Sequence, residues 1–387
     1  MNLQAYLQPR IESRLARIIE LPLARAYHQQ DHHSQQGLPE PVCESILSTG
    51  MHLRDQSLKL FQQKFAALNY RFLFQIPDQG VGVIWFQDLM QCLAHCGLAV
   101  ESVSMRDAEF HQKWEAFRPN VFISMDTLEV LRSLDLDYIQ AYKMKKGLIR
   151  LFTPINPYRF PKTGLSSEDH WRLDLARAGK SVDAYFSMMQ ASFYERFNLH
   201  WHQAGLRYLS LPFGCNPFIH YPRNAQKTYD YFMATSFGYE RAKLTYQFIL
   251  PIFKKYSGLW AGPQWKFGIG PLPAGDVPSY YAQSKIVLNP LAGFIKQFPA
   301  EITERAFTAT ACGAFQITEP TPITEEFFRP DELIQAKNAY DYQRLFEAYL
   351  LHADERNEIA LKGMQRVYAQ HTYFHRIEKL LMFLQQL

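Results

Sequence analysis

The spacing of hydrophobic residues changes several times along the chain, and each spacing predicts a different element. Near the N-terminus, apolar residues recur at helical intervals and predict an amphipathic helix: Leu15, Ile18, Ile19 and Leu23. From residue 70 onward, short apolar runs alternate with stretches of helical period. The run "YRFLFQIP" (70–77) predicts a strand, and "VIWFQDLMQCLAHCG" (83–97) predicts the helix that follows it. Such alternation is typical of a parallel, doubly wound sheet.

The alternation stops at a connector and then begins again. The connector "YLSLPFGCNPFIHYP" (208–222) contains a glycine and three prolines, which prevent a continuing helix. Beyond it, "YDYFMATSFG" (229–238) again predicts a strand followed by a turn. We therefore predict two consecutive α/β domains. The expected divisions are a helical extension, two sheet domains and a last helix that returns to the first domain: 1–66, 67–222, 223–370 and 371–387.

Composition narrows the class of protein. The chain has 387 residues, 47% hydrophobic and 20% charged, which fits a globular protein of about two domains. It shows no apolar run of membrane-spanning length and no signal-peptide pattern at the start. The net charge of +4 is mild and is not gathered into a long basic run, so we expect no nucleic-acid partner. Peripheral membrane contact stays open, because mild basicity and 15% aromatic residues suit it. The 5 irregularly spaced cysteines predict reduced thiols in a cytoplasmic protein.

The most informative stretch is "TERAFTATACGAFQITE" (303–319). It predicts a helix over 303–312 with Thr303 as N-cap, ended by a left-handed Gly313 and followed by a strand over 314–318. Glu319 would then emerge at the carboxyl edge of the sheet, where ligands bind in such folds. Arg305 lies in the first helical turn, where a cation is unfavourable unless an anion binds there. An ion pair with a neighbouring glutamate is the alternative.

Residues 305–381 resemble the C-terminal half of GT-B glycosyltransferases, and most closely the spore-maturation (CgeB-like) group. The segments "AGPQW" (261–265) and "SKIVLNP" (284–290) also resemble that family. The resemblance rests on the following residues: Arg305, Phe307, Cys312, Gly313, Ala314, Phe327, Phe328, Glu355, Arg356, Ile359, Ala360, Gly363, Arg366, Val367, His371, Thr372, Tyr373 and Arg376. It implies two Rossmann-like domains that face a central crevice, with a nucleotide-diphosphate sugar as donor. One position departs from the family: Thr308 stands where an acid is expected to bind the donor ribose.

The resemblance also implies roles for particular residues. Arg305 and Arg241 would meet the charge that develops on the leaving diphosphate, and Lys296 would assist them. Trp265, after Gly262, would stack on or wall the nucleobase, unless it packs a strand end. Thr303, Thr308 and Glu319 would complete the donor site. Asp126, which follows the strand "NVFISM" (120–125), is the candidate acceptor base.

These observations predict a cytoplasmic glycosyltransferase that uses no metal or other cofactor. The acceptor would be a glycan, a protein or a small molecule. Two other classes remain open: a nucleotide-sugar epimerase on the same scaffold, and a non-catalytic sugar-nucleotide or glycan-binding protein, which the threonine at position 308 favours.

Overall fold

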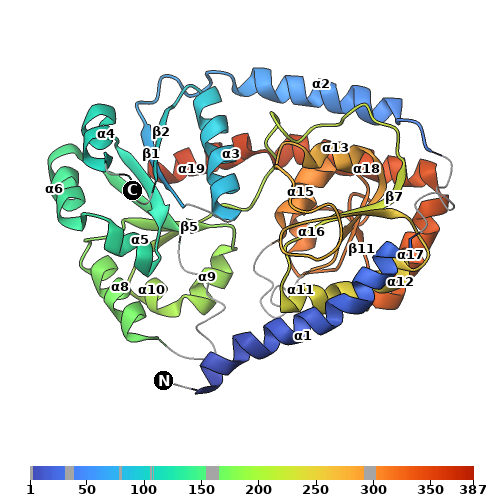
Figure 1. The fold of residues 1–387 in the computed structure, drawn as a ribbon. Helices are drawn as coiled ribbons and strands as arrows, with labels where there is room; N and C mark the ends of the chain where they lie inside the picture. The colour runs from blue at the N-terminus through green and yellow to red at the C-terminus, as the bar shows by residue number, and fades with distance from the viewer. Residues whose placement is uncertain are drawn as a thin grey trace. The chain divides into compact units, whose positions relative to one another are not determined.

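The computed structural model describes residues 3–30, 39–77, 81–104, 107, 109–153, 165–291 and 302–387. The chain divides into two compact units (Figure 1). One, here called the C-terminal sheet unit, consists of Met1–Gln56 with Pro217–Gln370. The other, the N-terminal sheet unit, consists of Ser57–Asn216 with His371–Leu387. Each contains one parallel sheet, so the predicted pair of α/β domains is confirmed.

The N-terminal sheet unit has six described strands in the order β2-β1-β3-β4-β5-β6. Their bounds are β1 Arg71–Ile76, β2 Ala99–Ser104, β3 Val121–Met125, β4 Ile149–Thr153, β5 Ala184–Ser187 and β6 Arg207–Ser210. The accompanying helices are α3 Val81–His95, α4 Phe110–Phe117, α5 Leu128–Ser133, α6 Leu136–Lys146, α8 Ser167–Arg177, α9 Ala191–Phe197 and α10 Leu199–Gln203. Every described strand pair is parallel, and the inner strands β1, β3 and β5 are buried on both faces, as is typical of a parallel sheet. The edge strands β2 and β6 are more exposed and more polar.

The last helix, α19 (Tyr373–Leu384), completes this unit by packing against α3. Phe374 stacks on Phe61 with ring centroids 4.8 Å apart. The buried guanidinium of Arg376 donates to the carbonyl oxygens of Pro212 and Phe213, each at 2.9 Å. The helix is therefore held both by apolar packing and by charge-assisted hydrogen bonds.

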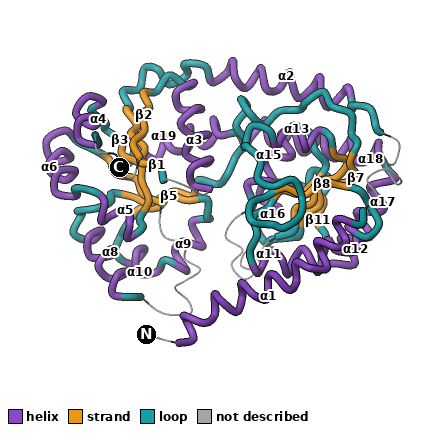
Figure 2. Tube along the Cα trace, viewed as in Figure 1, coloured by secondary structure: helices purple, strands orange, loops and turns teal. Residues whose placement is uncertain are grey.

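The C-terminal sheet unit has five described strands in the order β11-β10-β9-β7-β8, all parallel. Figure 2 draws the strands in orange and the helices in purple. Their bounds are β7 Tyr229–Ala234, β8 Gly258–Ala261, β9 Ser284–Asn289, β10 Gln316–Thr318 and β11 Ile334–Gln335. Its helical elements after residue 217 are α11 Tyr239–Leu244, the π-helical turn η2 Thr245–Ile249, α12 Leu250–Phe253, α13 Val277–Ala282, α15 Glu304–Ala311, α16 Thr324–Phe327, α17 Ala339–Leu351 and α18 Ala353–Gln370.

The N-terminal helix α1 (Leu3–His28) packs against α11 and α12 of the C-terminal sheet unit, and α2 spans Glu44–Phe61. The prediction of one apolar face on α1 is wrong in part. Leu23 is fully buried, whereas Leu15 and Ile18 are 40% and 62% exposed. The reason is that α1 has apolar residues on two faces, and helical spacing alone does not say which face packs. Within the described residues, no helix combines the length and hydrophobicity that crossing a membrane would require.

Candidate functional site

The order of strands in the C-terminal sheet unit defines where a ligand would bind. β7 pairs with β8 on one side and with β9 on the other, so the direction of strand succession reverses at β7. Connections from strands on the two sides of such a switch point leave toward opposite faces of the sheet and open a crevice beyond the strand ends. The chain segments at this point are the loop after Ala234 and the end of β9 at Asn289.

Arg305 lies at this switch point. Its Nη1 donates to Asn289 Oδ1 at 2.8 Å, and its Nη2 donates to the carbonyl oxygen of Ala234. The guanidinium therefore bridges the carboxyl ends of β9 and β7. Asn289 is fully buried and also donates from Nδ2 to Thr303 Oγ1 and Gln316 Oε1, each at 3.1 Å. These bonds fix the amide so that its oxygen faces Arg305.

Arg241, on α11, points to the same place from the other side of β7. Its Nη1 donates to Thr235 Oγ1 at 2.5 Å. Burial, together with the nearby charge of Arg305, lowers the pKa of Arg241 to about 10. Both arginines are partly buried, and in the described part of the chain neither forms an ion pair with a carboxylate. Two close guanidinium groups with only neutral oxygen partners repel each other, and a bound anion would reverse that cost.

The helix that carries Arg305 has the predicted bounds and ending. α15 begins after Thr303 and ends before Gly313, whose φ of 69° is left-handed. The role of Thr303 differs in detail, because its hydroxyl bonds Asn289 and its side chain caps no amide of the first turn. The Thr303 side chain therefore does not occupy the N–H groups of that turn, whereas its backbone carbonyl oxygen accepts from the Ala306 N–H at 3.0 Å.

Gly262 and Trp265 lie in the loop after β8 and support Thr235. Gly262 has a φ of 144°, and a Cβ there would lie 1.8 Å from the Thr235 carbonyl oxygen, so only glycine fits. Trp265 Nε1 donates to that same oxygen at 2.8 Å. Its ring is buried edge-on against Trp260 and Phe237, with centroids 5.0 Å apart in both pairs. These contacts match the packing alternative for Trp265 and make it a positioning residue for Thr235.

The remaining predicted donor-site residues are placed as follows. Glu319 is buried at the end of β10, where its Oε2 accepts from the backbone N–H of Leu291 at 2.9 Å. Thr308 is buried within α15 near Tyr281, and burial raises the pKa of the Tyr281 hydroxyl to about 12. Lys296 lies outside the described residues.

Asp126 belongs to the other unit, directly after β3. Its Oδ2 accepts from the Tyr185 hydroxyl at 2.9 Å and lies 3.6 Å from Arg172 Nη1, which also donates to the Asp126 carbonyl oxygen at 2.8 Å. Burial raises the pKa of this carboxyl group, and Oδ1 has no hydrogen-bond partner among the described residues. These contacts are compatible with two roles for Asp126: a structural ion pair with Arg172, or a general base.

Sequence reasoning did not find Asn289 and Thr235. Each is a polar side chain directly at or after the end of a buried strand, which is the signal that could have identified them. Among the described residues, no group of three or more histidine, cysteine, aspartate or glutamate side chains is arranged to hold a metal ion.

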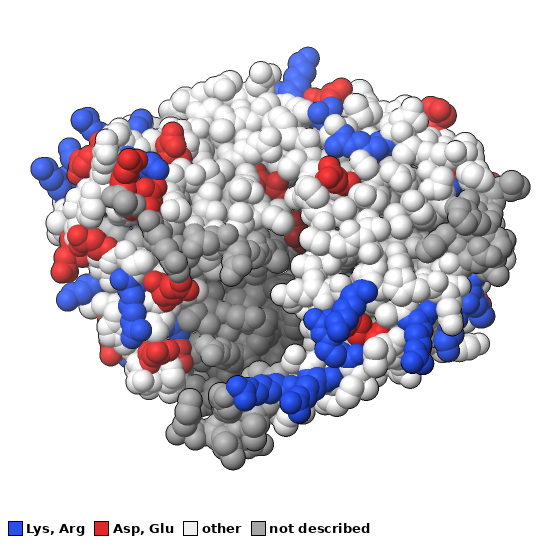
Figure 3. Space-filling view, in the orientation of Figure 1, with Lys and Arg blue, Asp and Glu red and all other residues white. Residues whose placement is uncertain are grey.

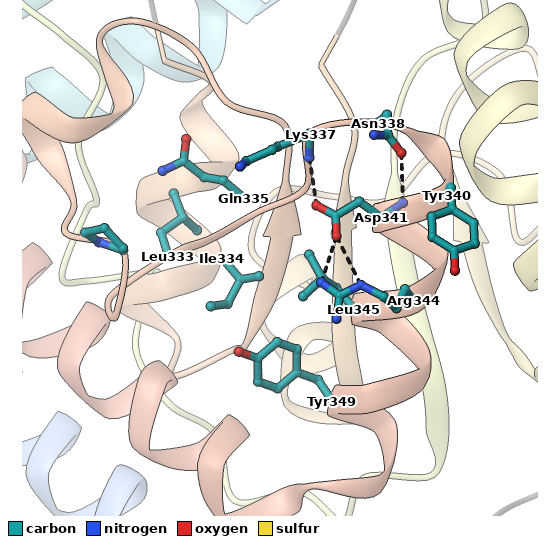
Figure 4. A pocket seen from close by; sticks show the side chains of 11 residues that line it. Leu333, Ile334, Gln335, Lys337, Asn338, Tyr340, Asp341, Arg344, Leu345 and Tyr349 are labelled. Carbon is teal, nitrogen blue, oxygen red and sulfur yellow. Dashed lines mark hydrogen bonds and ion pairs between the residues drawn. The ribbon is translucent and has the colours of Figure 1, made fainter.

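A separate pocket of about 550 Å³ lies beside β11 and α17 (Figure 4). It is lined in part by Gln335, Lys337, Tyr340 and Tyr349. Its Asp341 is already engaged, because it accepts from Arg344 Nη2 at 2.8 Å and from the Lys337 backbone N–H at 3.1 Å. No residue of the arginine pair lines this pocket, so its volume does not identify the site of the chemistry.

Comparison with known proteins agrees with this geometry. Residues 245–382 match a family model described as glycosyl transferase-like, and no curated protein matches the chain. Sucrose-phosphate synthase from Thermosynechococcus elongatus is a similar solved structure, with 12% identity, a TM-score of 0.57 and coverage of 82% of this chain and 99% of that one. The Anabaena protein Alr3699/HepE in complex with UDP has 9% identity, a TM-score of 0.54 and coverage of 83% and 100%. A mutant of T4 phage BGT in complex with UDP-glucose has 13% identity, a TM-score of 0.53 and coverage of 82% and 98%.

The chain therefore has the GT-B fold and contains a glycosyltransferase-like domain over residues 245–382. The expected fold class is confirmed. Membership of the CgeB-like group stays a prediction.

Proposed function

We propose that this protein is a glycosyltransferase that moves a sugar from a nucleotide-diphosphate donor to a nucleophile on a glycan, a protein or a small molecule. The observation that carries the proposal is the pair Arg241 and Arg305 at the switch point, close together and without a carboxylate partner in the described chain. The glycosyltransferase-like domain supports it. So do the solved structures of similar fold, which contain UDP or UDP-glucose.

The chemistry follows from the charges. When the bond between the sugar and the diphosphate breaks, negative charge accumulates on the departing phosphate oxygen. Donors that are fixed before the reaction stabilise this charge without further reorganisation. Asn289, Ala234 and Thr235 hold the two guanidinium groups in place, and the first-turn amides of α15 would add further donors. Arginine suits this role because its planar fork binds two phosphate oxygens at once.

A metal ion is not needed for the diphosphate under this proposal, because the arginine pair supplies the positive charge that a divalent cation would otherwise provide. Activity is therefore expected to survive an excess of EDTA. Loss of activity on chelation, with recovery after addition of magnesium or manganese, would contradict this part of the proposal. We also propose that the protein acts in the cytoplasm, because its cysteines are irregularly spaced and the described ones are all free.

The test is product analysis after incubation with a panel of radiolabelled nucleotide sugars. Transfer to an added acceptor, or slow hydrolysis of one donor, is the expected result. Interconversion of two nucleotide sugars would identify an epimerase. Binding without any chemical change would identify a sugar-nucleotide-binding protein. In that case the buried Thr308 would be the first residue to examine.

A further inference from the structure

Helix α1 has two apolar faces, and only one of them packs against the protein. The inner face contains Ala16, Leu23, Ala26 and Tyr27, which are at most 6% exposed. The outer face exposes four large aliphatic side chains: Ile11 at 48%, Leu15 at 40%, Ile18 at 62% and Leu21 at 58%. Their spacing of three and four residues places them on one side of the helix. We call these four residues the outer stripe.

A stripe of this kind needs an explanation, because single exposed apolar residues are ordinary but contiguous ones mark an interaction surface. Two arginines share its spacing. Arg14 precedes Ile18 by four positions and lies among the residues of the outer stripe, and Arg25 follows Leu21 by four and lies at the C-terminal end of the stripe. Both are exposed, and neither forms an ion pair within the described part of the chain. Long basic side chains beside apolar ones can extend toward anionic groups while their stems stay in apolar surroundings.

The surface next to α1 adds two basic side chains, with the exposed Glu240 of α11 as an acidic neighbour. Lys266 is exposed in a loop tied to α1, since its backbone N–H donates to Glu20 Oε1 at 2.7 Å. Lys243 is exposed on α11, which packs directly against α1. Glu20 itself is 2% exposed and accepts from Arg17 Nη1 at 2.6 Å, so it contributes little negative charge to the surface. Figure 3 shows lysine and arginine side chains along α1 and the elements beside it, with few acidic side chains among them.

We propose that the outer stripe of α1 docks the protein on the surface of a membrane rich in anionic phospholipid. An amphipathic helix with basic residues beside its apolar face lies in the plane of the interface, with that face inserted at the boundary between headgroups and acyl chains. The aliphatic residues supply apolar burial, and Arg14 and Arg25 supply attraction to phosphate groups. No described helix could span the bilayer, so contact would be at the interface only. This proposal does not depend on sugar transfer.

The test is cosedimentation of the full-length protein with vesicles. Vesicles that contain phosphatidylglycerol should bind the protein at low salt, whereas vesicles of phosphatidylcholine alone should bind it weakly. Arg14→Ala and Arg25→Ala should each weaken binding about fivefold, because a basic residue near an anionic surface contributes about 1 kcal/mol. Ile18→Ser should weaken it about tenfold, because a large apolar side chain would no longer be inserted.

Matched controls exist elsewhere on the chain. Leu351 is 80% exposed on α17, so Leu351→Ser removes an apolar side chain outside the stripe. Lys145 is exposed on α6, so Lys145→Ala removes a charge from another basic segment. Both should bind vesicles as the wild type does, and all five variants should keep the wild-type melting temperature, because the altered side chains are exposed.

A second readout reports insertion directly. In Ile18→Trp, tryptophan emission should shift to shorter wavelength when phosphatidylglycerol vesicles are added. The proposal is wrong if the wild type does not bind anionic vesicles, or if Ile18→Ser binds them as well as the wild type. It is also wrong if the stripe instead forms a dimer in solution that Ile18→Ser dissociates, because the occupant would then be a second copy of the chain.

Discussion

Replacement of Arg305 by alanine tests the anion site most directly. The variant removes a guanidinium that bridges Asn289 and the Ala234 carbonyl oxygen at the ends of β9 and β7. A charge-assisted hydrogen bond to a bound diphosphate contributes about 1.5–3 kcal/mol. Arg305→Ala should therefore weaken the binding of a nucleoside diphosphate by roughly 10- to 150-fold, since 1.36 kcal/mol corresponds to a factor of about ten.

Stability should change much less than affinity. The variant loses two hydrogen bonds to neutral oxygens, each worth about 0.5–1.5 kcal/mol. It also removes the repulsion between Arg305 and Arg241 and an unfavourable charge at the start of α15. These contributions oppose each other, so the free energy of unfolding without ligand should stay within about 1 kcal/mol of the wild-type value.

Isothermal titration calorimetry with UDP and GDP, combined with thermal unfolding, measures both quantities. Arg305→Lys should recover only part of the affinity, because an ammonium group cannot form the two-pronged contact. Arg344→Ala is the matched control, since this arginine lines the separate pocket beside α17 and is paired with Asp341. If Arg305→Ala binds as the wild type does, or if Arg344→Ala loses affinity instead, the diphosphate does not bind at the switch point.

Three further outcomes are expected. Gly262→Ala should cost about 2–5 kcal/mol of stability and weaken nucleotide binding, because a Cβ would collide with the Thr235 carbonyl oxygen. Gly275→Ala is the control, since a Cβ at Gly275 would have nothing within 4 Å, and it should leave thermal unfolding and nucleotide titration unchanged. Burial raises the pKa of Asp88 to about 6 from 3.8, so its ionisation destabilises the fold as pH rises through that range. Asp88→Asn should therefore stabilise the fold more at pH 7 than at pH 4, with a difference of up to about 3 kcal/mol in the free energy of unfolding, and thermal unfolding should show a larger rise in melting temperature at pH 7. An equal rise in melting temperature at both pH values would contradict this prediction. Asp126→Asn should lower kcat by about 10²-fold or more with unchanged donor affinity if Asp126 is the acceptor base, and a wild-type kcat would leave it as a structural residue.

Much of the architecture could be predicted because it depends on local patterns. Short apolar runs between helical stretches predicted most strands of both sheets, and the glycine at position 313 ended α15 at the expected place. Two short edge strands were missed: β6 begins the segment that was predicted to be a connector, and β11 was not predicted. Arg305 could be selected because a cation in a first helical turn is locally unfavourable, and this is visible without any tertiary contact.

The partners of the arginines could not be predicted, for a physical reason. Arg305 meets both Asn289 and the Ala234 carbonyl oxygen only because β9 and β7 are neighbours in the sheet, although α11, β8 and α13 lie between those strands along the chain. Strand order is a long-range property that residue spacing does not encode. The hydroxyl of Thr303 could be placed at the start of α15, but its bond to Asn289 could not be anticipated, because residue spacing does not say where α15 packs against β9.

The return of α19 to the N-terminal sheet unit has a consequence for biosynthesis. This unit is not continuous in sequence, because Pro217–Gln370 of the other unit lies between its two segments, Ser57–Asn216 and His371–Leu387. The backbone N–H of Cys215 donates to the His371 carbonyl oxygen, and that of Tyr373 donates to the Cys215 carbonyl oxygen, so the two segments join only after the ribosome has passed Tyr373. Until α19 has been made, the side of α3 that packs against it stays exposed to solvent. Chains that stop before α19 would thus expose a surface that chaperones and proteases recognise.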